Sequence, residues 1–157
     1  MRRFLLVSSL VLTVGSWLAG APAFAAENWI GSWKLNAARS KLLSNGMRTE
    51  SLKFEATADG IQLHSEGTDP QGKPLHTSYT SKFDGKDVPW TGNPMADTAS
   101  PKRIDDNLYK NVWKKDGKPT VTSTVSVSKD GKTLTIIQNG KDAKGAPLNS
   151  LAVYDRQ

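Results

Sequence analysis

Short turn motifs recur along most of this chain, and their spacing is the feature that most constrains its fold. Most neighbouring motifs lie 11 to 14 residues apart. This interval accommodates one strand and a tight hairpin but leaves no room for a crossover helix. Asp-Gly and Asn-Gly pairs supply the positive φ angles that tight hairpins require. The motifs are Asn45-Gly46, Asp59-Gly60, Asp69-Pro70-Gln71-Gly72, Asp84-Gly85-Lys86, Asp105-Asp106-Asn107, Asp116-Gly117-Lys118, Asp130-Gly131-Lys132 and Ala143-Lys144-Gly145.

Between the motifs, apolar and polar residues alternate with the period of a β-strand. Leu52, Phe54 and Ala56 share one face of such a strand, and the polar or charged residues between them share the other. Period two with one apolar face is typical of strands that are half buried against a common interior. We therefore expect about nine strands, at residues 29–35, 47–57, 61–68, 74–83, 97–104, 108–115, 119–128, 133–139 and 147–155.

A meander of this length must cover or join its two edge strands. Because each strand leads into the next through a hairpin, closure of the first strand on the last is the simplest way to remove both edges. The sequence therefore predicts an all-β fold, an up-and-down antiparallel β-barrel of about 8–10 strands. Residues 36–45 predict a short helix after the first strand, capped by Asn36. Residues 87–96 contain Pro89, Gly92 and Pro94 and predict a long loop at one end of the barrel.

The N-terminus has the pattern of a cleavable signal peptide. Two arginines precede an uncharged apolar stretch from Phe4 to Ala19, and an Ala-x-Ala site ends at Ala25. The apolar run is shorter than the roughly 20 residues that a membrane-spanning helix needs. We expect a signal peptide at 1–25 and a single domain at 26–157, exported by the general secretory route. The mature chain would then be periplasmic or secreted, with no integral membrane segment.

Residue content excludes several function classes. The chain has no cysteine, which excludes thiol catalysis, thiolate metal sites and disulfides. Without the two arginines of the leader, 19 basic and 15 acidic side chains remain, a formal charge of +4. The lysines lie mostly singly in turns beside Asp and Gly, which is typical of a solvated surface and not of a stripe that binds nucleic acid. We therefore expect no nucleic-acid partner.

Two segments resemble the calycin superfamily of β-barrels, which includes the lipocalins and the fatty-acid-binding proteins. The opening Gly31-Ser32-Trp33-Lys34-Leu35 is similar to the Gly-x-Trp-Lys-Leu start of calycins. The closing Ala152-Val153-Tyr154-Asp155-Arg156 resembles the last strand of the fatty-acid-binding proteins. More narrowly, segments 31–36, 84–87 and 91–94 resemble a group of small exported bacterial proteins of unassigned function.

The resemblance implies roles for particular residues. In calycins the tryptophan that corresponds to Trp33 closes one end of the barrel under a basic side chain from near the C-terminus. Arg156 is the candidate partner through a cation–π contact, with Gly31 beside it in the barrel closure. Fatty-acid-binding proteins hold a ligand carboxylate with an Arg-x-Tyr on the last strand and an arginine two strands earlier. Of that set only Tyr154 is present; the other positions hold Ala152 and, approximately, Thr124.

The sequence has no Gly-x-Ser-x-Gly, no His-Glu-x-x-His and no phosphate-cradling glycine loop. Arg48 and Glu50 have the parity of the inward face of their strand and are the only candidates for titratable groups inside a barrel. We favour the interpretation that they cap the rim of the barrel. The two histidines, His64 and His76, are predicted on the polar side of adjacent strands near Glu66. A transition metal there would need more ligands, so we interpret them as surface residues. We expect no enzymatic activity, no metal and no cofactor.

The predicted interior combines aromatic side chains with hydroxyls. Ser65, Thr77, Ser81 and Ser123 have inward parity. A solid core holds few hydroxyls without partners, whereas a barrel of eight or more strands is wide enough for a cavity. We therefore expect a binding protein for a small apolar or amphipathic ligand. The alternative is a filled barrel that acts as a structural or protein-interaction module of the cell envelope. The expected cavity lining is Phe54, Tyr79, Phe83, Trp90, Val125 and Tyr154.

Overall fold

The computed structural model describes residues 28–43, 46–141 and 145–157. The predicted signal peptide and its cleavage site lie outside these residues. Within them, no helix is long and apolar enough to cross a membrane. The elements are β1 (Gly31–Leu35), the 3₁₀ helix η2 (Ala37–Arg39), β2 (Arg48–Thr57), β3 (Gly60–Thr68), β4 (Pro74–Ser81), β5 (Val88–Pro89), β6 (Thr98–Asp105), β7 (Leu108–Lys115), β8 (Lys118–Val127), β9 (Thr133–Lys141) and β10 (Pro147–Arg156).

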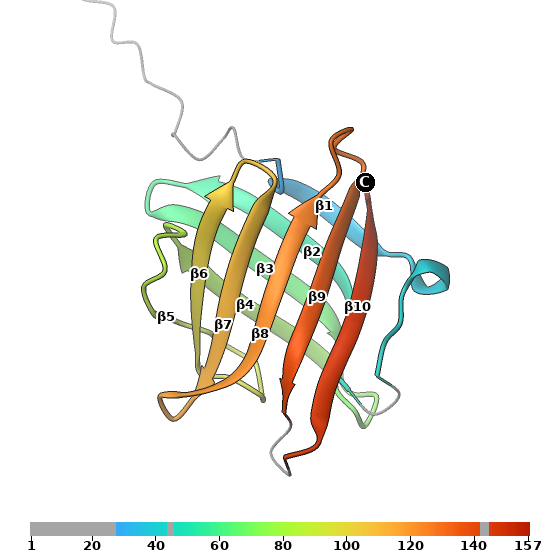
Figure 1. Cartoon of the computed structure of the whole chain (residues 1–157), viewed down its shortest axis with the longest axis vertical. Helices are drawn as coiled ribbons and strands as arrows, with labels where there is room; N and C mark the ends of the chain where they lie inside the picture. The colour runs from blue at the N-terminus through green and yellow to red at the C-terminus, as the bar shows by residue number, and fades with distance from the viewer. Residues whose placement is uncertain (1–27, 44–45, 142–144) are drawn as a thin grey trace, which may run out of the picture.

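The ten strands form one antiparallel sheet in the order β4-β3-β2-β1-β10-β9-β8-β7-β6-β5. Every neighbour in this order, apart from β1 and β10, is also a neighbour in the chain. The first strand pairs with the last, with Trp33 opposite Arg156 and Leu35 opposite Tyr154. Strands β6–β10 make the near wall in Figure 1, and β2–β4 make the far wall. The predicted up-and-down β-barrel is confirmed.

The barrel closes at a seam between β4 and the segments that follow it. Ser78 and Thr91 exchange two backbone hydrogen bonds of 3.0 and 2.9 Å. Nearer the other end, the carbonyl of Phe83 accepts from the Arg103 amide of β6 at 2.9 Å. The predicted loop at 87–96 is therefore part of the wall, because it contains β5 and pairs with β4. The seam has fewer backbone hydrogen bonds than the pairings between the longer strands. The barrel is therefore nearly, but not completely, closed.

The helix after β1 is shorter than predicted. Asn36 is its N-cap as expected, since its Oδ1 accepts from the Arg39 amide at 3.2 Å. The helix ends after one turn, because Lys41 returns to β10 and exchanges backbone hydrogen bonds of 2.7 and 3.0 Å with Leu151. Pairing with a strand satisfies the same donors and acceptors that a longer helix would have used.

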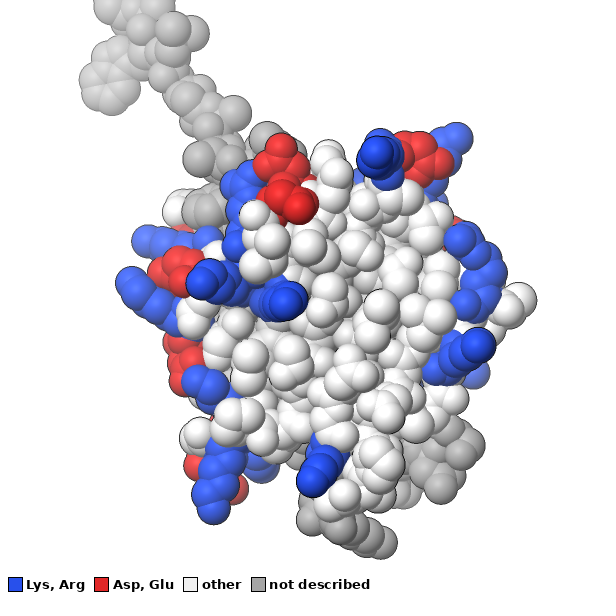
Figure 2. Space-filling view, viewed as in Figure 1, with Lys and Arg blue, Asp and Glu red and all other residues white. Residues whose placement is uncertain are grey.

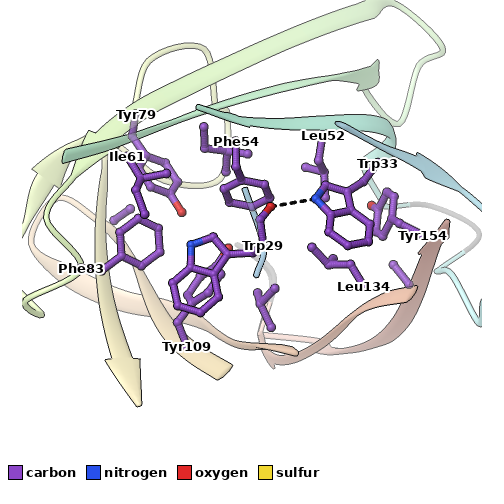
Figure 3. Close-up of a cluster of buried hydrophobic side chains, with 14 of the residues drawn as sticks. Trp29, Trp33, Leu52, Phe54, Ile61, Tyr79, Phe83, Tyr109, Leu134 and Tyr154 are labelled. Carbon is purple, nitrogen blue, oxygen red and sulfur yellow. Dashed lines mark hydrogen bonds between the residues drawn. The ribbon is translucent and has the colours of Figure 1, made fainter. Parts of the chain in front are cut away.

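One end of the barrel is filled by an aromatic cluster around Trp29, which is fully buried. The Trp29 ring stacks on Phe83 at a centroid distance of 5.7 Å and meets the ring of Tyr109 edge-on at 5.3 Å. Phe54 also contacts Tyr109, at 6.3 Å. Figure 3 shows these rings converging between the two walls, with the Trp33 indole hydrogen-bonded to the Trp29 carbonyl at 2.8 Å. No ligand could occupy this end without displacing the cluster.

Candidate ligand cavity

The opposite half of the barrel encloses a cavity of about 100 Å³. Both walls and the segments that cover this end contribute to it. Of the described residues that line it, none is Asp, Glu, Lys, Arg or His. The lining is Leu42, Leu43, Gly46, Met47, Thr49, Leu52, Leu63, Ser65, Thr77, Tyr79, Trp90, Met95, Tyr109, Asn111, Trp113, Val121, Ser123, Val125, Ile136, Gln138, Leu148, Ser150, Ala152 and Tyr154.

Four of the six residues expected to line a cavity do so: Tyr79, Trp90, Val125 and Tyr154. The other two, Phe54 and Phe83, face the interior but belong to the packed cluster at the Trp29 end. Strand alternation predicts which face a side chain occupies. It carries no information on how far along the barrel axis the packed region extends.

Two aromatic side chains gather around Trp90 in the cavity wall. The ring of Trp90 meets Tyr79 edge-on at 5.2 Å and Trp113 edge-on at 4.8 Å. Its indole N–H donates to the Thr77 hydroxyl at 2.9 Å, and Thr77 also shares a hydrogen bond of 2.7 Å with Ser65. Ser65 and Thr77, two of the hydroxyls predicted to be inside the barrel, are therefore hydrogen-bonded to each other, and Thr77 also fixes the position of Trp90. Trp90 points into the barrel and not towards solvent.

A row of polar side chains crosses the wall that β7–β10 form, one from each of these four neighbouring strands. Cross-strand pairing places Asn111 of β7 opposite Ser123 of β8, Ser123 opposite Gln138 of β9, and Gln138 opposite Ser150 of β10. All four line the cavity. We call these residues the polar row. The Asn111 Oδ1 accepts from the Ser100 amide at 3.0 Å, and the Gln138 Oε1 accepts from the Ser150 hydroxyl at 2.8 Å.

Two further donors in the cavity wall have no partner among the described residues: the Tyr79 hydroxyl and the Trp113 indole N–H. Burial raises the pKa values of Tyr79, Tyr109 and Tyr154 well above the ordinary value of 10.0. The three phenols are therefore protonated at any physiological pH and can donate hydrogen bonds. The Tyr154 phenol already donates to the Thr49 carbonyl at 3.1 Å. The Tyr79 phenol lies near the Tyr109 phenol, and each affects the other's pKa, but it makes no hydrogen bond of ordinary geometry with a described residue.

The solvent-facing end of the cavity is bordered by apolar side chains that are only partly buried. They are Leu42, Met47, Met95 and Leu148, all packed against the core. Leucine and methionine can change rotamer at modest energetic cost, and methionine is especially adaptable. This rim is where a small ligand would reach the cavity with the least rearrangement, because the Trp29 end is packed.

Arg48 and Glu50 do not have the inward orientation that the alternation of their strand predicted, and neither lines the cavity. A β-bulge between Thr49 and Ser51 shifts the register of β2 by one residue. A one-residue shift exchanges the two faces of a strand. Thr49 consequently lines the cavity, while Arg48 and Glu50 are exposed and form an ion pair of 3.4 Å.

The histidines lie on the outer surface of the far wall, as predicted. Glu66 pairs with His76 in the register of β3 and β4, and the His76 Nδ1 lies 3.9 Å from a Glu66 carboxylate oxygen. In the described parts of the chain, no three or more acidic or imidazole side chains are grouped to hold a metal ion. His64 is exposed on the same surface.

The residues expected to close the barrel are in contact. Arg156 lies over the Trp33 ring, with its guanidinium carbon 4.2 Å from the ring centroid. Gly31 has a φ of +132°, and a Cβ there would lie 2.6 Å from the Arg156 Nη1. Only glycine leaves room for the guanidinium at this position without strain.

Several cavity residues are absent from the expected lining. In β7, Asn111 and Trp113 alternate with residues that point outward. In β9, Gln138 likewise lies between outward-pointing residues. The period-two pattern of these strands was the signal that could have identified them. The strand predicted at 29–35 includes Trp29, which lies at the packed end of the barrel, but the sequence pattern gives this residue no particular role. The buried position of Trp29 follows from its contacts with distant strands, which the sequence pattern does not contain.

No family model matches the chain, and a search of curated proteins finds no significant match.

Proposed function

We propose that this protein is an exported binding protein that encloses a small, partly apolar ligand at the Leu42–Met95 end of a calycin-like barrel. The observation that carries the proposal is the cavity itself. Its lining is mostly apolar and aromatic, with a few uncharged polar groups. Ligand sites in proteins commonly have this composition, in which the apolar part supplies burial and the polar groups set orientation.

The size of the cavity limits the ligand. Sites for drug-sized ligands have volumes of roughly 300–1,000 Å³, well above the 100 Å³ of this cavity. An engineered apolar cavity of about 150 Å³ takes up benzene. Because this cavity is smaller than that, a short apolar group at the end of a longer molecule would enter with the least displacement, and a small ring would need the side chains of the rim to move. Displacement of the methionines at the rim would admit a larger part of such a molecule.

Export is the second part of the proposal. It is supported by the arginines, the apolar stretch and the Ala-x-Ala site at the N-terminus. A ligand-binding barrel outside the cytoplasm would serve as a carrier or sequestering protein in the periplasm or the medium.

The alternative, a filled barrel that binds a protein through residues 88–94 around Trp90, has less support. The Trp90 indole is 9% exposed and hydrogen-bonded inside the barrel, so it is not presented to a partner. The surface of Figure 2 has an uncharged central area bordered by lysines and arginines. Nothing on that area specifies a partner, and the cavity is the more specific feature.

Native mass spectrometry of the protein purified from its own host tests the proposal. We expect a bound adduct that is lost on denaturation. Ser123→Leu would fill the cavity from β8 and remove the adduct, whereas Thr124→Leu, on the outward face of the same strand, would leave it in place. Adduct-free protein whose tryptophan fluorescence responds to no small apolar compound would refute ligand binding.

A further inference from the structure

We propose that the ligand is an uncharged compound whose polar group is a hydrogen-bond acceptor, such as a carbonyl oxygen, received by the polar row and Tyr79. This inference rests on the proposed function and specifies the ligand class. It follows from two properties of the cavity wall: the lack of charge in its described part and an excess of hydrogen-bond donors.

The lack of charge excludes ionic ligands. A carboxylate or ammonium group inside the cavity would lose its hydration without gaining an oppositely charged partner, because the described lining contains only neutral side chains. The phenols cannot supply a negative charge, since burial raises the pKa values of Tyr79, Tyr109 and Tyr154. The wall therefore selects a neutral molecule.

The excess of donors determines the kind of polar group. Asn111 and Gln138 use their carbonyl oxygens for the Ser100 amide and the Ser150 hydroxyl. Their amide nitrogens, which can only donate, remain for a ligand. The Tyr79 hydroxyl and the Trp113 N–H are buried without partners in the described structure. A buried donor without a partner is destabilising, and an acceptor atom on the ligand would remove that penalty.

The donors come from opposite sides of the cavity, and the position of the aromatic rings adds a shape requirement. Gln138 and Asn111 belong to the near wall of Figure 1, and Tyr79 belongs to the far wall. Trp90 and Trp113 lie in edge-on contact beside them. A compact ring with an acceptor oxygen would place its apolar body against these rings and its oxygen near one of the donor groups.

A set of six-membered-ring compounds tests this selectivity with the full chain. Methylcyclohexane is the apolar compound, cyclohexanone carries the acceptor oxygen, and cyclohexylammonium carries a positive charge; the three have equal numbers of heavy atoms. Cyclohexanecarboxylate is the negatively charged compound of the set. We expect cyclohexanone to bind roughly three- to tenfold more tightly than methylcyclohexane, as one additional hydrogen bond implies. The two ions should show no binding. Calorimetry and tryptophan fluorescence measure the affinities.

Two variants connect the selectivity to the named donors. Tyr79→Phe removes a hydroxyl without a partner, so the fold should keep its stability while the preference for cyclohexanone falls. Gln138→Leu removes a donor from the polar row at similar side-chain volume and should have the same effect. Asn139→Leu is the control, because Asn139 is the next residue of β9 and is exposed.

The outcomes separate this inference from the proposed function. Equal or tighter binding of methylcyclohexane, or a cyclohexanone preference unchanged in both variants, would overturn the acceptor proposal and leave ligand binding intact. Binding of either ion at the affinity of cyclohexanone would also overturn it. If none of the ring compounds binds and no adduct is found in the native protein, the proposed function itself fails.

Discussion

The guanidinium of Arg156 covers the indole ring of Trp33 at 4.2 Å and also joins two separate segments of backbone. It donates hydrogen bonds to the carbonyls of Asn28, Ile30 and Gly131. One side chain near the C-terminus therefore holds the segment that precedes β1 and the β8–β9 turn together. The planar, five-donor guanidinium can make these bonds and the ring contact at once, which a lysine cannot do.

Arg156→Ala should lower the free energy of unfolding by about 2 kcal/mol, because it removes a cation–π contact and charged hydrogen bonds at a partly exposed site. Arg156→Lys should restore less than half of this loss. Trp33→Ala should cost about 4 kcal/mol, since Trp33 is a large, buried side chain. Chemical denaturation measures all three.

Arg39→Ala is the matched control for Arg156. Arg39 forms an exposed ion pair of 3.3 Å with Asp155, and such pairs contribute roughly 0–1 kcal/mol. A loss in Arg156→Ala no greater than that in Arg39→Ala would contradict a structural role for the Arg156–Trp33 contact.

The seam of the barrel can be tested with two glycines that have the same backbone conformation. Gly92 and Gly117 have φ values of +77° and +72°, but a Cβ at Gly92 would lie 2.1 Å from the His76 carbonyl oxygen, whereas one at Gly117 would meet nothing within 4 Å. Gly117→Ala should cost about 1 kcal/mol from backbone strain alone. Gly92→Ala should cost at least about 3 kcal/mol, because β4 and the β5 segment must separate.

Thermal unfolding of the two variants gives this comparison directly. Hydrogen exchange at the Ser78 and Thr91 amides, which bond to each other's carbonyls, should quicken in Gly92→Ala and remain slow in Gly117→Ala. Equal stability of the two variants would mean that the seam is looser in solution than the backbone contact requires.

All three tyrosines of the chain are inside the barrel, so alkaline pH should report on the fold. Their pKa values are raised in the folded state from an ordinary value of 10.0. The unfolded chain loses these protons first, so their contribution to stability is present below pH 10 and declines as pH rises above it. Tyrosinate absorbance should appear in one cooperative step, together with the loss of near-ultraviolet circular dichroism.

In denaturant, the same absorbance should titrate near pH 10. Folded protein that shows one or more tyrosines ionising near pH 10, with its tertiary spectrum unchanged, would place at least one phenol in contact with solvent.

Low pH should weaken the contacts that hold the β5 segment, through Asp87, to β6 and β7. The Asp87 carboxylate accepts from Lys114 at 2.6 and 2.8 Å and from the Ser100 hydroxyl at 2.5 Å. Lys114 first, and then Ser100, hold the Asp87 pKa below its ordinary value of 3.8. Asp87 therefore stabilises the fold above about pH 4, and this contribution is lost as pH falls through the lower pKa of the folded state.

Asp87→Asn should be less stable than the parent protein at pH 7, and the difference should shrink progressively below pH 4. Asp59→Asn, in the exposed β2–β3 turn, makes the same change in charge away from the seam. The test is to measure the melting temperatures of the parent protein and both variants between pH 2 and pH 7. If the difference in melting temperature between Asp87→Asn and the parent protein stays constant with pH, the ionised carboxylate is not the cause of that difference.

The sequence predicted the strands closely because turn chemistry and alternation are local properties. Asp-Gly turns mark where strands end, and the period-two pattern of Leu52 and Phe54 or of Ser123 and Val125 identifies the inward face. The contact between Trp33 and Arg156 was predicted from family resemblance. Arg48 and Glu50 were misplaced because a bulge at Thr49 has no distinctive residue pattern; it depends on how β2 pairs with β3.

Local sequence thus determined where most strands begin and end, the inward face of most of them and the hydroxyl-bearing character of the interior. Only the tertiary structure decided where along the barrel the interior is packed and where it is open. Trp29 fills one end together with Phe83 and Tyr109, although these residues are far apart in the chain. The polar row also depends on the register of four strands. The packed end and the polar row both result from long-range packing. The position of a side chain along the barrel axis and the register of its strand are set by contacts between strands, and not by the order of residues within one strand.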